Sequence, residues 1–134
     1  MSSSTPAADT ETRRRPMILL VDDQADVRFM LSLFLEDAGM DFDEATSGEE
    51  AIERSGTAAY DLILLDQRMP PGLSGIEVAE RLRGDGSDTP IVLYSAFLDP
   101  RVEQRANDLG LRTVDKGEPD RLMDAVRTTL HEAA

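Results

Sequence analysis

The feature that most constrains the fold is a set of short, continuous apolar runs that recur along the chain. The strong runs are MILLV (17–21), DLILL (61–65) and PIVLY (90–94), and weaker extended candidates lie at 40–45 and 112–115. The strong runs do not alternate apolar with polar residues, which is typical of strands that are covered on both faces. The sequence therefore predicts a sheet that is buried between two layers.

Amphipathic segments separate these runs. In the first segment, apolar residues recur with helical spacing from Val27 to Ala38, and Gly39 is expected to end the helix. Ser47 precedes the acidic stretch GEEAIE, which is typical of a helix N-cap. Three further helices are expected around 76–82, 102–109 and 122–130.

Five strand-then-helix units predict an α/β fold with a parallel sheet and helices on both faces. Right-handed crossovers leave few topologies for such a chain. For five units the common solution is a flavodoxin-like (βα)5 three-layer sandwich, with a parallel five-stranded sheet in the order 2-1-3-4-5. Ligands of such sheets bind at the carboxyl ends of the strands, where the order reverses between the first and the third strand.

One domain is expected at residues 17–132. Residues 1–16 are polar and poor in apolar side chains, and we interpret them as a disordered leader. The Arg13–Arg15 cluster is expected to be solvated, and contact with an acidic partner is the alternative.

The composition excludes several classes of function. The 134 residues contain no cysteine, so disulfides and thiolate metal sites are excluded. The apolar runs are too short to cross a membrane, and the N-terminus lacks the apolar core of a secretory signal. The net charge of −13 disfavours nucleic acid and anionic lipid as partners, and suits cations and basic protein surfaces. We therefore expect a cytoplasmic protein that binds neither nucleic acid nor a membrane directly.

Several predicted strands end at residues that suit phosphate or metal chemistry. These residues are Asp22 and Asp23 after the first strand, Asp66 after the third, Ser95 after the fourth and Lys116 after the fifth. Two unit charges about 4 Å apart repel by about 4 kcal/mol at an effective dielectric of about 20, so converging carboxylates need a proton or a cation. An all-oxygen ligand set favours a hard divalent ion such as Mg²⁺, which phosphate oxygens complete.

Taken singly, each of these residues has a simpler interpretation. Asp22 and Asp23 could cap the helix that follows them, because acids at that position complement the helix dipole. Asp66 and Ser95 could be turn residues, and Lys116 could be solvated. Their joint arrangement at one edge of the predicted sheet favours a site for Mg²⁺ and a phosphoryl group.

The ordered set of motifs resembles the receiver domain of two-component response regulators, from about Met17 to Glu132. The stretches that show the resemblance are ILLVDDQADVR, EATSGEEAIE, DLILLDQRMPPGLSGIEVAERLR, PIVLYSA and VDKGEP. The resemblance implies a signalling domain, not an enzyme, that uses Mg²⁺ as its cofactor. It implies a phosphoryl donor, either a sensor histidine kinase or a histidine phosphotransfer protein. It also implies a downstream effector protein or output domain.

Site roles follow from the positions that match the family. Asp66 matches the phosphoacceptor. Asp23 matches the direct Mg²⁺ ligand, and Asp22 matches the neighbour that acts through water. Asp66 and the backbone carbonyl of Arg68 match the other protein ligands of the metal.

Three further positions match the groups that surround the phosphoryl group. Ser95 matches the switch hydroxyl, Ala96 the small residue whose backbone N–H faces the phosphate, and Lys116 the basic residue that pairs with it. The loop after Lys116 begins with Gly117 and is expected to be flexible.

The chain departs from the family at the position of the switch aromatic, which here is Thr113. A relay through an aromatic flip at Thr113 is therefore impossible. Tyr94 is close in sequence, but adjacent strand residues face opposite sides, so it is not expected to substitute. Arg68 and Phe97 match two positions that tune the lifetime of the phosphoryl group, and their bulk predicts a long lifetime.

The resemblance implies an output surface formed by the fourth predicted helix, the fifth strand and the fifth helix. A homodimer through this surface is a further expectation. The chain is expected to be a stand-alone receiver or the receiver of a larger regulator. The alternatives are a pseudo-receiver that only binds a partner and a small flavodoxin-like enzyme. The full acidic site disfavours the first, and the acidic DDQAD loop disfavours nucleotide binding without a metal.

Overall fold

The predicted sheet is present, with its strands in the predicted order. The structure is a computed structural model that describes residues 14–133. Within this range, the parallel strands form one five-stranded sheet in the order β2-β1-β3-β4-β5. The strands are β1 (Met17–Val21), β2 (Asp41–Ala45), β3 (Leu62–Asp66), β4 (Ile91–Ser95) and β5 (Arg112–Asp115). Asp66 and Ser95, expected just after their strands, are the last residues of β3 and β4.

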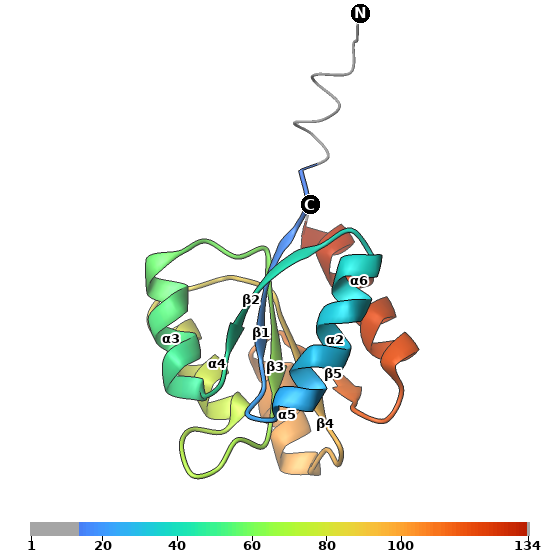
Figure 1. Ribbon diagram of the computed structural model, residues 1–134. Helices are drawn as coiled ribbons and strands as arrows, with labels where there is room; N and C mark the ends of the chain where they lie inside the picture. The colour runs from blue at the N-terminus through green and yellow to red at the C-terminus, as the bar shows by residue number, and fades with distance from the viewer. Residues whose placement is uncertain (1–13, 134) are drawn as a thin grey trace, which may run out of the picture.

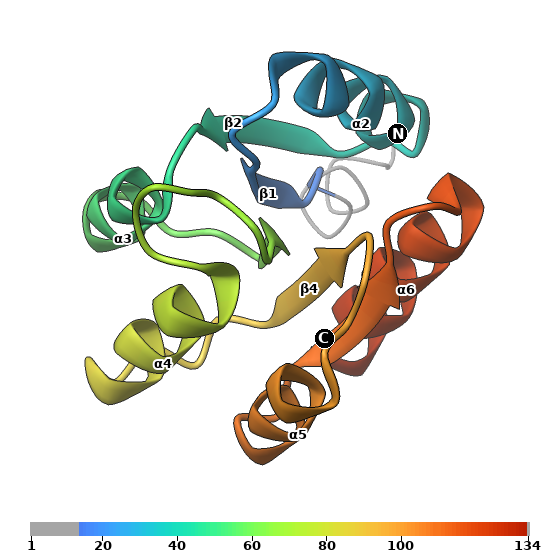
Figure 2. The ribbon, with the colours of Figure 1, turned by 90° about the horizontal axis from the view of Figure 1, so that it is seen from below.

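Helices cover both faces of this sheet and complete the predicted three-layer sandwich. They are α2 (Ala25–Asp37), α3 (Gly48–Thr57), α4 (Gly75–Gly84), α5 (Pro100–Asp108) and α6 (Pro119–Ala133). Helices α2 and α6 lie on one face, and α3, α4 and α5 lie on the other (Figures 1 and 2). Among residues 14–133, none of the helices combines the length and the apolar character that a membrane crossing requires.

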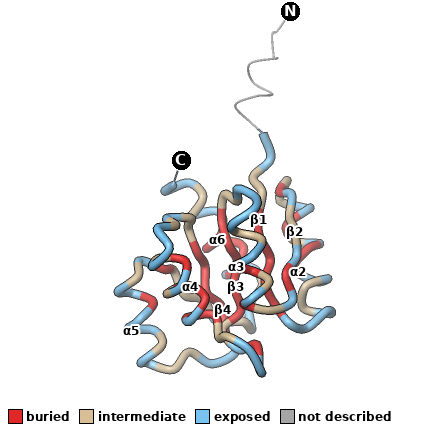
Figure 3. Tube along the Cα trace, turned by 90° about the vertical axis from the view of Figure 1, so that its left-hand side faces the viewer, coloured by how far each residue is buried: buried red, intermediate tan, exposed pale blue. Residues whose placement is uncertain are grey.

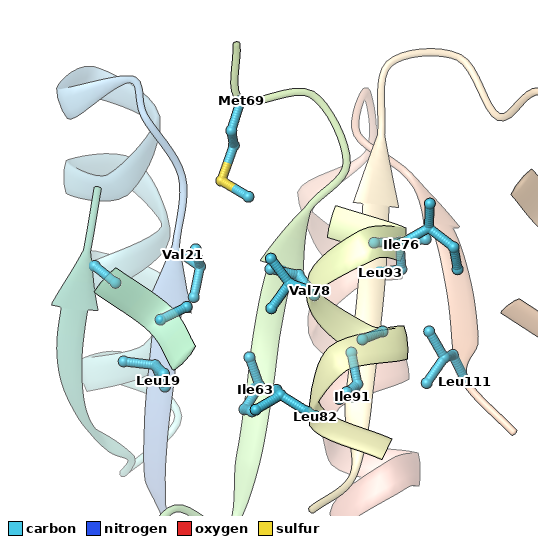
Figure 4. Close-up of a cluster of buried hydrophobic side chains, with 14 of the residues drawn as sticks. Leu19, Val21, Ile63, Met69, Ile76, Val78, Leu82, Ile91, Leu93 and Leu111 are labelled. Atoms are coloured by element: carbon cyan, nitrogen blue, oxygen red, sulfur yellow. The ribbon is translucent and has the colours of Figure 1, made fainter. Parts of the chain in front are cut away.

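The core is divided by the sheet into two apolar clusters. Leu19 and Val21 face the layer of α3, α4 and α5 (Figure 4), whereas Ile18 and Leu20 face α2 and α6. The buried positions run along the central strands (Figure 3), because both side-chain directions of these strands meet a helix. This two-sided burial is the physical reason why the strong runs lack polar alternation.

Helix ends agree with most of the sequence signals. Ser47 caps α3 by accepting a hydrogen bond from the Glu50 backbone N–H at 3.1 Å, and Gly39 lies beyond α2 with a φ of 81°. The interpretation of the acidic pair as a helix cap is wrong. The N-cap of α2 is Gln24, and within the described residues its side chain makes no capping hydrogen bond.

The first described residues are attached to the amino ends of the strands. Arg14 pairs with Asp61 at 2.9 Å, and Arg15 pairs with Asp41 at 2.9 Å. These two arginines are therefore not simply solvated, as was expected for the Arg13–Arg15 cluster. The rest of the predicted leader, residues 1–13, lies outside the described residues.

Gly75 allows α4 to begin against the strand that ends at Asp66. Its backbone N–H donates to the Gln67 carbonyl at 2.9 Å. A methyl group added at Gly75 would lie 2.5 Å from the Asp66 backbone oxygen and 2.6 Å from Leu93 Cδ1. Backbone on one side and a packed core side chain on the other leave no room for a side chain.

Gly75→Ala is therefore expected to lower the free energy of unfolding by about 1–3 kcal/mol, as overpacking does. The matched control is Gly56→Ala in α3, where an added methyl group meets nothing within 4 Å. That change is expected to stabilise the protein by about 0.5 kcal/mol, because glycine costs backbone entropy in a helix. Urea denaturation of both variants measures the difference, and equal stability of the two would contradict the packing argument.

Candidate functional site

Three carboxylates meet at the carboxyl ends of β1 and β3. Asp22 and Asp66 are buried, and Asp23 is exposed. One carboxylate oxygen of each residue lies within 4.8 Å of the other two. The pairing of β1 with β3 produces this cluster, because Val21 lies opposite Leu65 and the acids come next along both strands.

Lys116 supplies a positive charge between the two buried carboxylates. Its Nζ lies 3.3 Å from Oδ2 of Asp22 and 3.4 Å from Oδ2 of Asp66. The Lys116 backbone N–H donates to the Ser95 carbonyl at 2.8 Å, so the end of β4 fixes the start of the loop that holds the lysine. One ammonium group thus serves two carboxylates that have little contact with water.

Tyr94 is not among the residues predicted for this site, yet its hydroxyl lies within it. The hydroxyl donates to Oδ2 of Asp22 at 2.8 Å and lies 3.3 Å from the Val21 carbonyl. Its ring lies below Lys116, whose Nζ is 5.4 Å from the ring centroid. As expected, Tyr94 faces α2 and α6, on the opposite side of the sheet from Leu93.

Strand parity contains the signal that identifies this tyrosine. Side chains at every second position share one face, and Leu20 and Leu64 lie on the face that packs against α2 and α6. The next positions of that parity are Asp22 and Asp66. Tyr94 has the same parity on β4. Strand parity therefore predicts that its ring lies on the same face of the sheet as Asp22 and Asp66, and on the opposite face from Thr113.

Desolvation dominates the electrostatics of Asp66. Burial raises the pKa of Asp66 to about 6 from its ordinary value of 3.8, and the charge of Asp22 adds to the rise. Lys116 and a backbone hydrogen bond oppose it, the latter donated by the Arg68 N–H to Oδ1 at 3.4 Å. Ionisation of Asp66 above pH 6 therefore lowers the free energy of unfolding of the domain.

The cluster has the composition of a Mg²⁺ site. Its ligand atoms are all oxygens, and its three carboxylates carry more charge than Lys116 can balance. Hard divalent cations prefer such donors. A bound cation would offset the repulsion among the three carboxylates at this edge of the sheet.

A cavity of about 520 Å³ opens above the acids. Among the residues that line it are Asp23, Asp66, Arg68, Ser95, Ala96 and Lys116, together with the apolar side chains Val27, Met30 and Pro70. The structure thus brings most of the predicted site residues to one cavity. Its opening to solvent would allow another molecule to approach Asp66.

Of the predicted switch and lifetime residues, Ser95 and Arg68 line the cavity, whereas Phe97 and Thr113 do not. Ser95 is buried, and its hydroxyl donates to the Phe97 carbonyl at 2.8 Å. Phe97 itself is 72% exposed and does not line the cavity in the described structure. Thr113 lies in β5 opposite Leu93, half-buried and apart from the acids. The structure therefore keeps Thr113 away from the other predicted site residues.

The family model of the response regulator receiver domain matches residues 18–127. The chain belongs to this family. Receiver domains are phosphoacceptors of two-component signalling systems and not catalytic enzymes, and such a domain implies a histidine kinase as its partner.

The receiver domain resembles parts of longer curated proteins. The transcriptional regulatory protein ResD of Bacillus subtilis is 47% identical over 79 residues, which are 59% of this chain and 32% of ResD. The transcriptional regulatory protein SrrA of Staphylococcus aureus is 39% identical over 79 residues, again 59% of this chain and 32% of the relative. The chain thus covers about a third of the length of these relatives.

Solved structures share the whole fold with the receiver domain. The receiver domain of the Francisella response regulator 1452 superposes with a TM-score of 0.82 at 26% identity, covering 90% of this chain and all (100%) of that one. The chemotaxis protein CheY4 of Vibrio cholerae superposes with a TM-score of 0.78 at 28% identity, covering 86% of this chain and 98% of that one.

Removal of the Asp66 charge is expected to stabilise the metal-free receiver domain. Because the folded pKa of about 6 lies above the ordinary 3.8, the folded state binds more protons between these values. Stability from this group therefore falls as pH rises from about 4 to about 6, and stays low above that. Asp66→Asn should raise the free energy of unfolding at pH 8 by about 1–3 kcal/mol, since each pKa unit corresponds to about 1.4 kcal/mol.

The measurement is urea denaturation in EDTA at several pH values. The gain should shrink as pH falls from about 6 to about 4 and approach zero only below about pH 3, where Asp66 is protonated in both states. Glu36→Gln, which removes one charge from an exposed position on α2, is the control and should show no such pH-dependent gain. A gain for Asp66→Asn that does not depend on pH would contradict the electrostatic explanation.

Proposed function

We propose that Asp66 accepts a phosphoryl group and that this receiver domain passes the change on to a partner. The observation that supports the proposal most directly is the position of the Asp66 carboxylate. It is buried beside Asp22, contacts Lys116 and lines an open cavity. Such a site offers positioning and charge stabilisation, which are the main requirements of phosphoryl transfer.

The proposed donor is a phosphohistidine on a sensor histidine kinase or a histidine phosphotransfer protein. An Asp66 carboxylate oxygen attacks phosphorus, and the new O–P bond forms as the P–N bond breaks. The bonding electrons return to the imidazole nitrogen, which takes up a proton from solvent. The pKa of about 6 leaves most Asp66 ionised at pH 7, so the nucleophile is available.

The residues that would hold Mg²⁺ are Asp23, Asp66 and the backbone carbonyl of Arg68, with Asp22 in support. When bound, the ion supplies positive charge that binds phosphoryl oxygens and offsets the acidic triad. Exposure of Asp23 at the cavity suits a direct ligand, whereas Asp22 is fully buried and already accepts hydrogen bonds. This difference supports the division of roles between the two adjacent acids.

Three groups are proposed to bind the transferred phosphoryl group. The Lys116 ammonium already contacts Asp66, Ser95 is the last residue of the neighbouring strand, and Ala96 lines the cavity. Ser95 would exchange its bond to the Phe97 carbonyl for one to a phosphoryl oxygen. That exchange would change the loop between β4 and α5.

The proposed output surface comprises α5, β5 and α6. Helix α5 is attached to the sheet by few apolar side chains: among its described residues Ala106 is buried, and Val102 is only partly buried. An element with so few anchors can shift at a small cost in free energy. An effector protein, an output domain of a longer regulator or a second copy of the chain would bind there in the cytoplasm.

Acetyl phosphate with Mg²⁺ is expected to add one phosphoryl group to the protein. Intact-protein mass spectrometry would detect the adduct, and hydroxylamine should remove it, because an acyl phosphate reacts with that nucleophile. Asp66→Asn and addition of EDTA should each abolish labelling. In the same sample, backbone amide resonances of residues 97–118 should shift if the output surface responds.

Glu36→Gln serves as the control for this labelling and should react like the wild type. A wild-type protein that binds Mg²⁺ but takes no label would show a pseudo-receiver that acts by binding alone. Label that persists in Asp66→Asn would place the acceptor elsewhere.

We propose that Arg68, which lines the cavity, and Phe97, once the loop between β4 and α5 turns its ring toward the cavity, lengthen the lifetime of the phosphoryl group by obstructing an attacking water. Phe97→Ala is expected to speed loss of phosphate roughly fivefold, equivalent to about 1 kcal/mol of barrier. Phe29→Ala removes another exposed phenyl ring, on α2, and should leave the rate unchanged. Loss of phosphate that is rapid in the wild type and unaltered in Phe97→Ala would exclude this role.

A further inference from the structure

Asp22 is the most enclosed acid of the receiver domain. Its exposed fraction is 0%, and each of its carboxylate oxygens accepts a hydrogen bond or an ion-pair contact. Oδ1 accepts from the Gln24 backbone N–H at 2.9 Å, and Oδ2 lies 2.8 Å from the Tyr94 hydroxyl and 3.3 Å from Lys116 Nζ. Two donors, one on β4 and one in the loop after β5, therefore share one oxygen.

Tyr94 reaches this oxygen across an intervening strand. It lies on β4 directly opposite Asp66 on β3, whereas Asp22 follows β1, on the far side of β3. The ring fills the space beneath Lys116 and is fully buried, which fixes the direction of the hydroxyl. Burial, followed by the charge of Asp22, raises the pKa of Tyr94 well above its ordinary value of 10, so the hydroxyl keeps its proton and remains a donor.

Phosphorylation of Asp66 would affect the two donors, Lys116 and Tyr94, differently. Lys116 also contacts Asp66 at 3.4 Å and would turn to a phosphoryl group on that residue. Among residues 14–133, the hydrogen-bond partners of the Tyr94 hydroxyl are Asp22 and the Val21 carbonyl, both on the β1 side of the site. A buried carboxylate that lost both donors would carry an uncompensated charge, at a cost well above that of one ordinary hydrogen bond.

We propose that Tyr94 is a positioning residue that keeps Asp22 oriented and compensated when Lys116 leaves it for the phosphoryl group. The inference rests on the proposed function of Asp66, since it assigns Tyr94 a role in the phosphorylated state of that site. Before phosphorylation both donors serve Asp22, and the tyrosine is partly redundant. After phosphorylation it is the remaining side-chain donor to Oδ2, and the state is stable only with its hydroxyl in place.

The test compares two ligands on the full chain, Mg²⁺ alone and beryllium fluoride with Mg²⁺, the second as a phosphoryl analogue. Tyr94→Phe keeps the ring and removes only the hydroxyl. Its affinity for beryllium fluoride should fall about tenfold, while its affinity for Mg²⁺ alone should change by less than about threefold. Isothermal titration calorimetry measures both constants, and thermal unfolding verifies that the variant is folded.

Tyr60→Phe is the matched control. Its hydroxyl also donates to an aspartate, Asp43 of β2, at 2.8 Å, and Tyr60 does not line the cavity above the acids. Both affinities should stay at the wild-type values in this variant. A similar loss in Tyr60→Phe would mean a general effect of removing a tyrosine hydroxyl and would overturn the inference.

Other outcomes separate this inference from the proposed function. Wild-type affinity of Tyr94→Phe for beryllium fluoride, or an equal loss for both ligands, rejects the role of Tyr94 and leaves Asp66 as the phosphoacceptor. A wild-type protein that binds Mg²⁺ but neither beryllium fluoride nor a phosphoryl group rejects both.

A second readout does not alter Tyr94 at all. The chain has two tyrosines, so Tyr94 is the only one left in Tyr60→Phe, and its ring resonances can be assigned without ambiguity. They should shift when beryllium fluoride is added to the Mg²⁺-bound protein, because the second donor to Asp22 departs. Ring resonances that do not change at that step would contradict the exchange of donors.

Discussion

The contact of one lysine with two buried carboxylates is the interaction on which the rest of the site depends. Lys116 lies between Asp22 and Asp66, and the third acid of the cluster, Asp23, adds further negative charge. One ammonium group cannot balance three carboxylates, so a cation bound at this site would be stabilised by the remaining negative charge. Burial, and after it the charge of Asp22, disfavours the ionised form of Asp66, and Lys116 opposes that effect only in part.

Strand order and side-chain parity together bring the carboxylates close to one another. Reversal of strand order between β1 and β3 brings two acidic strand ends side by side. The face shared with α2 and α6 continues beyond the apolar core into Asp22 and Asp66. Helices on both faces leave the Asp22 and Asp66 side chains almost no contact with water. The packing that stabilises the domain therefore also raises the free energy of these buried charges.

The fold and the approximate site could be predicted because both depend on patterns within the sequence. Continuous apolar runs identify β1, β3 and β4, and the residue at each strand end identifies Asp22, Asp66 and Ser95. The contact of Tyr94 with Asp22 could not be predicted in the same way. Strand alternation places its ring on the face of Asp22 and Asp66, but whether the hydroxyl reaches across β3 to Asp22 depends on tertiary packing that no local pattern encodes.

The ion pairs of Arg14 and Arg15 have a mechanical consequence. They fasten the chain at the amino ends of the strands, and β1 runs from there straight to the acidic pair at the other end. Tension on the chain at residue 14 would first load two solvent-exposed ion pairs, which are individually weak. It would then act along β1, in shear against hydrogen-bond ladders to both β2 and β3. The strand that leads to Asp22 and Asp23 is thus held on both sides against a force applied at residue 14.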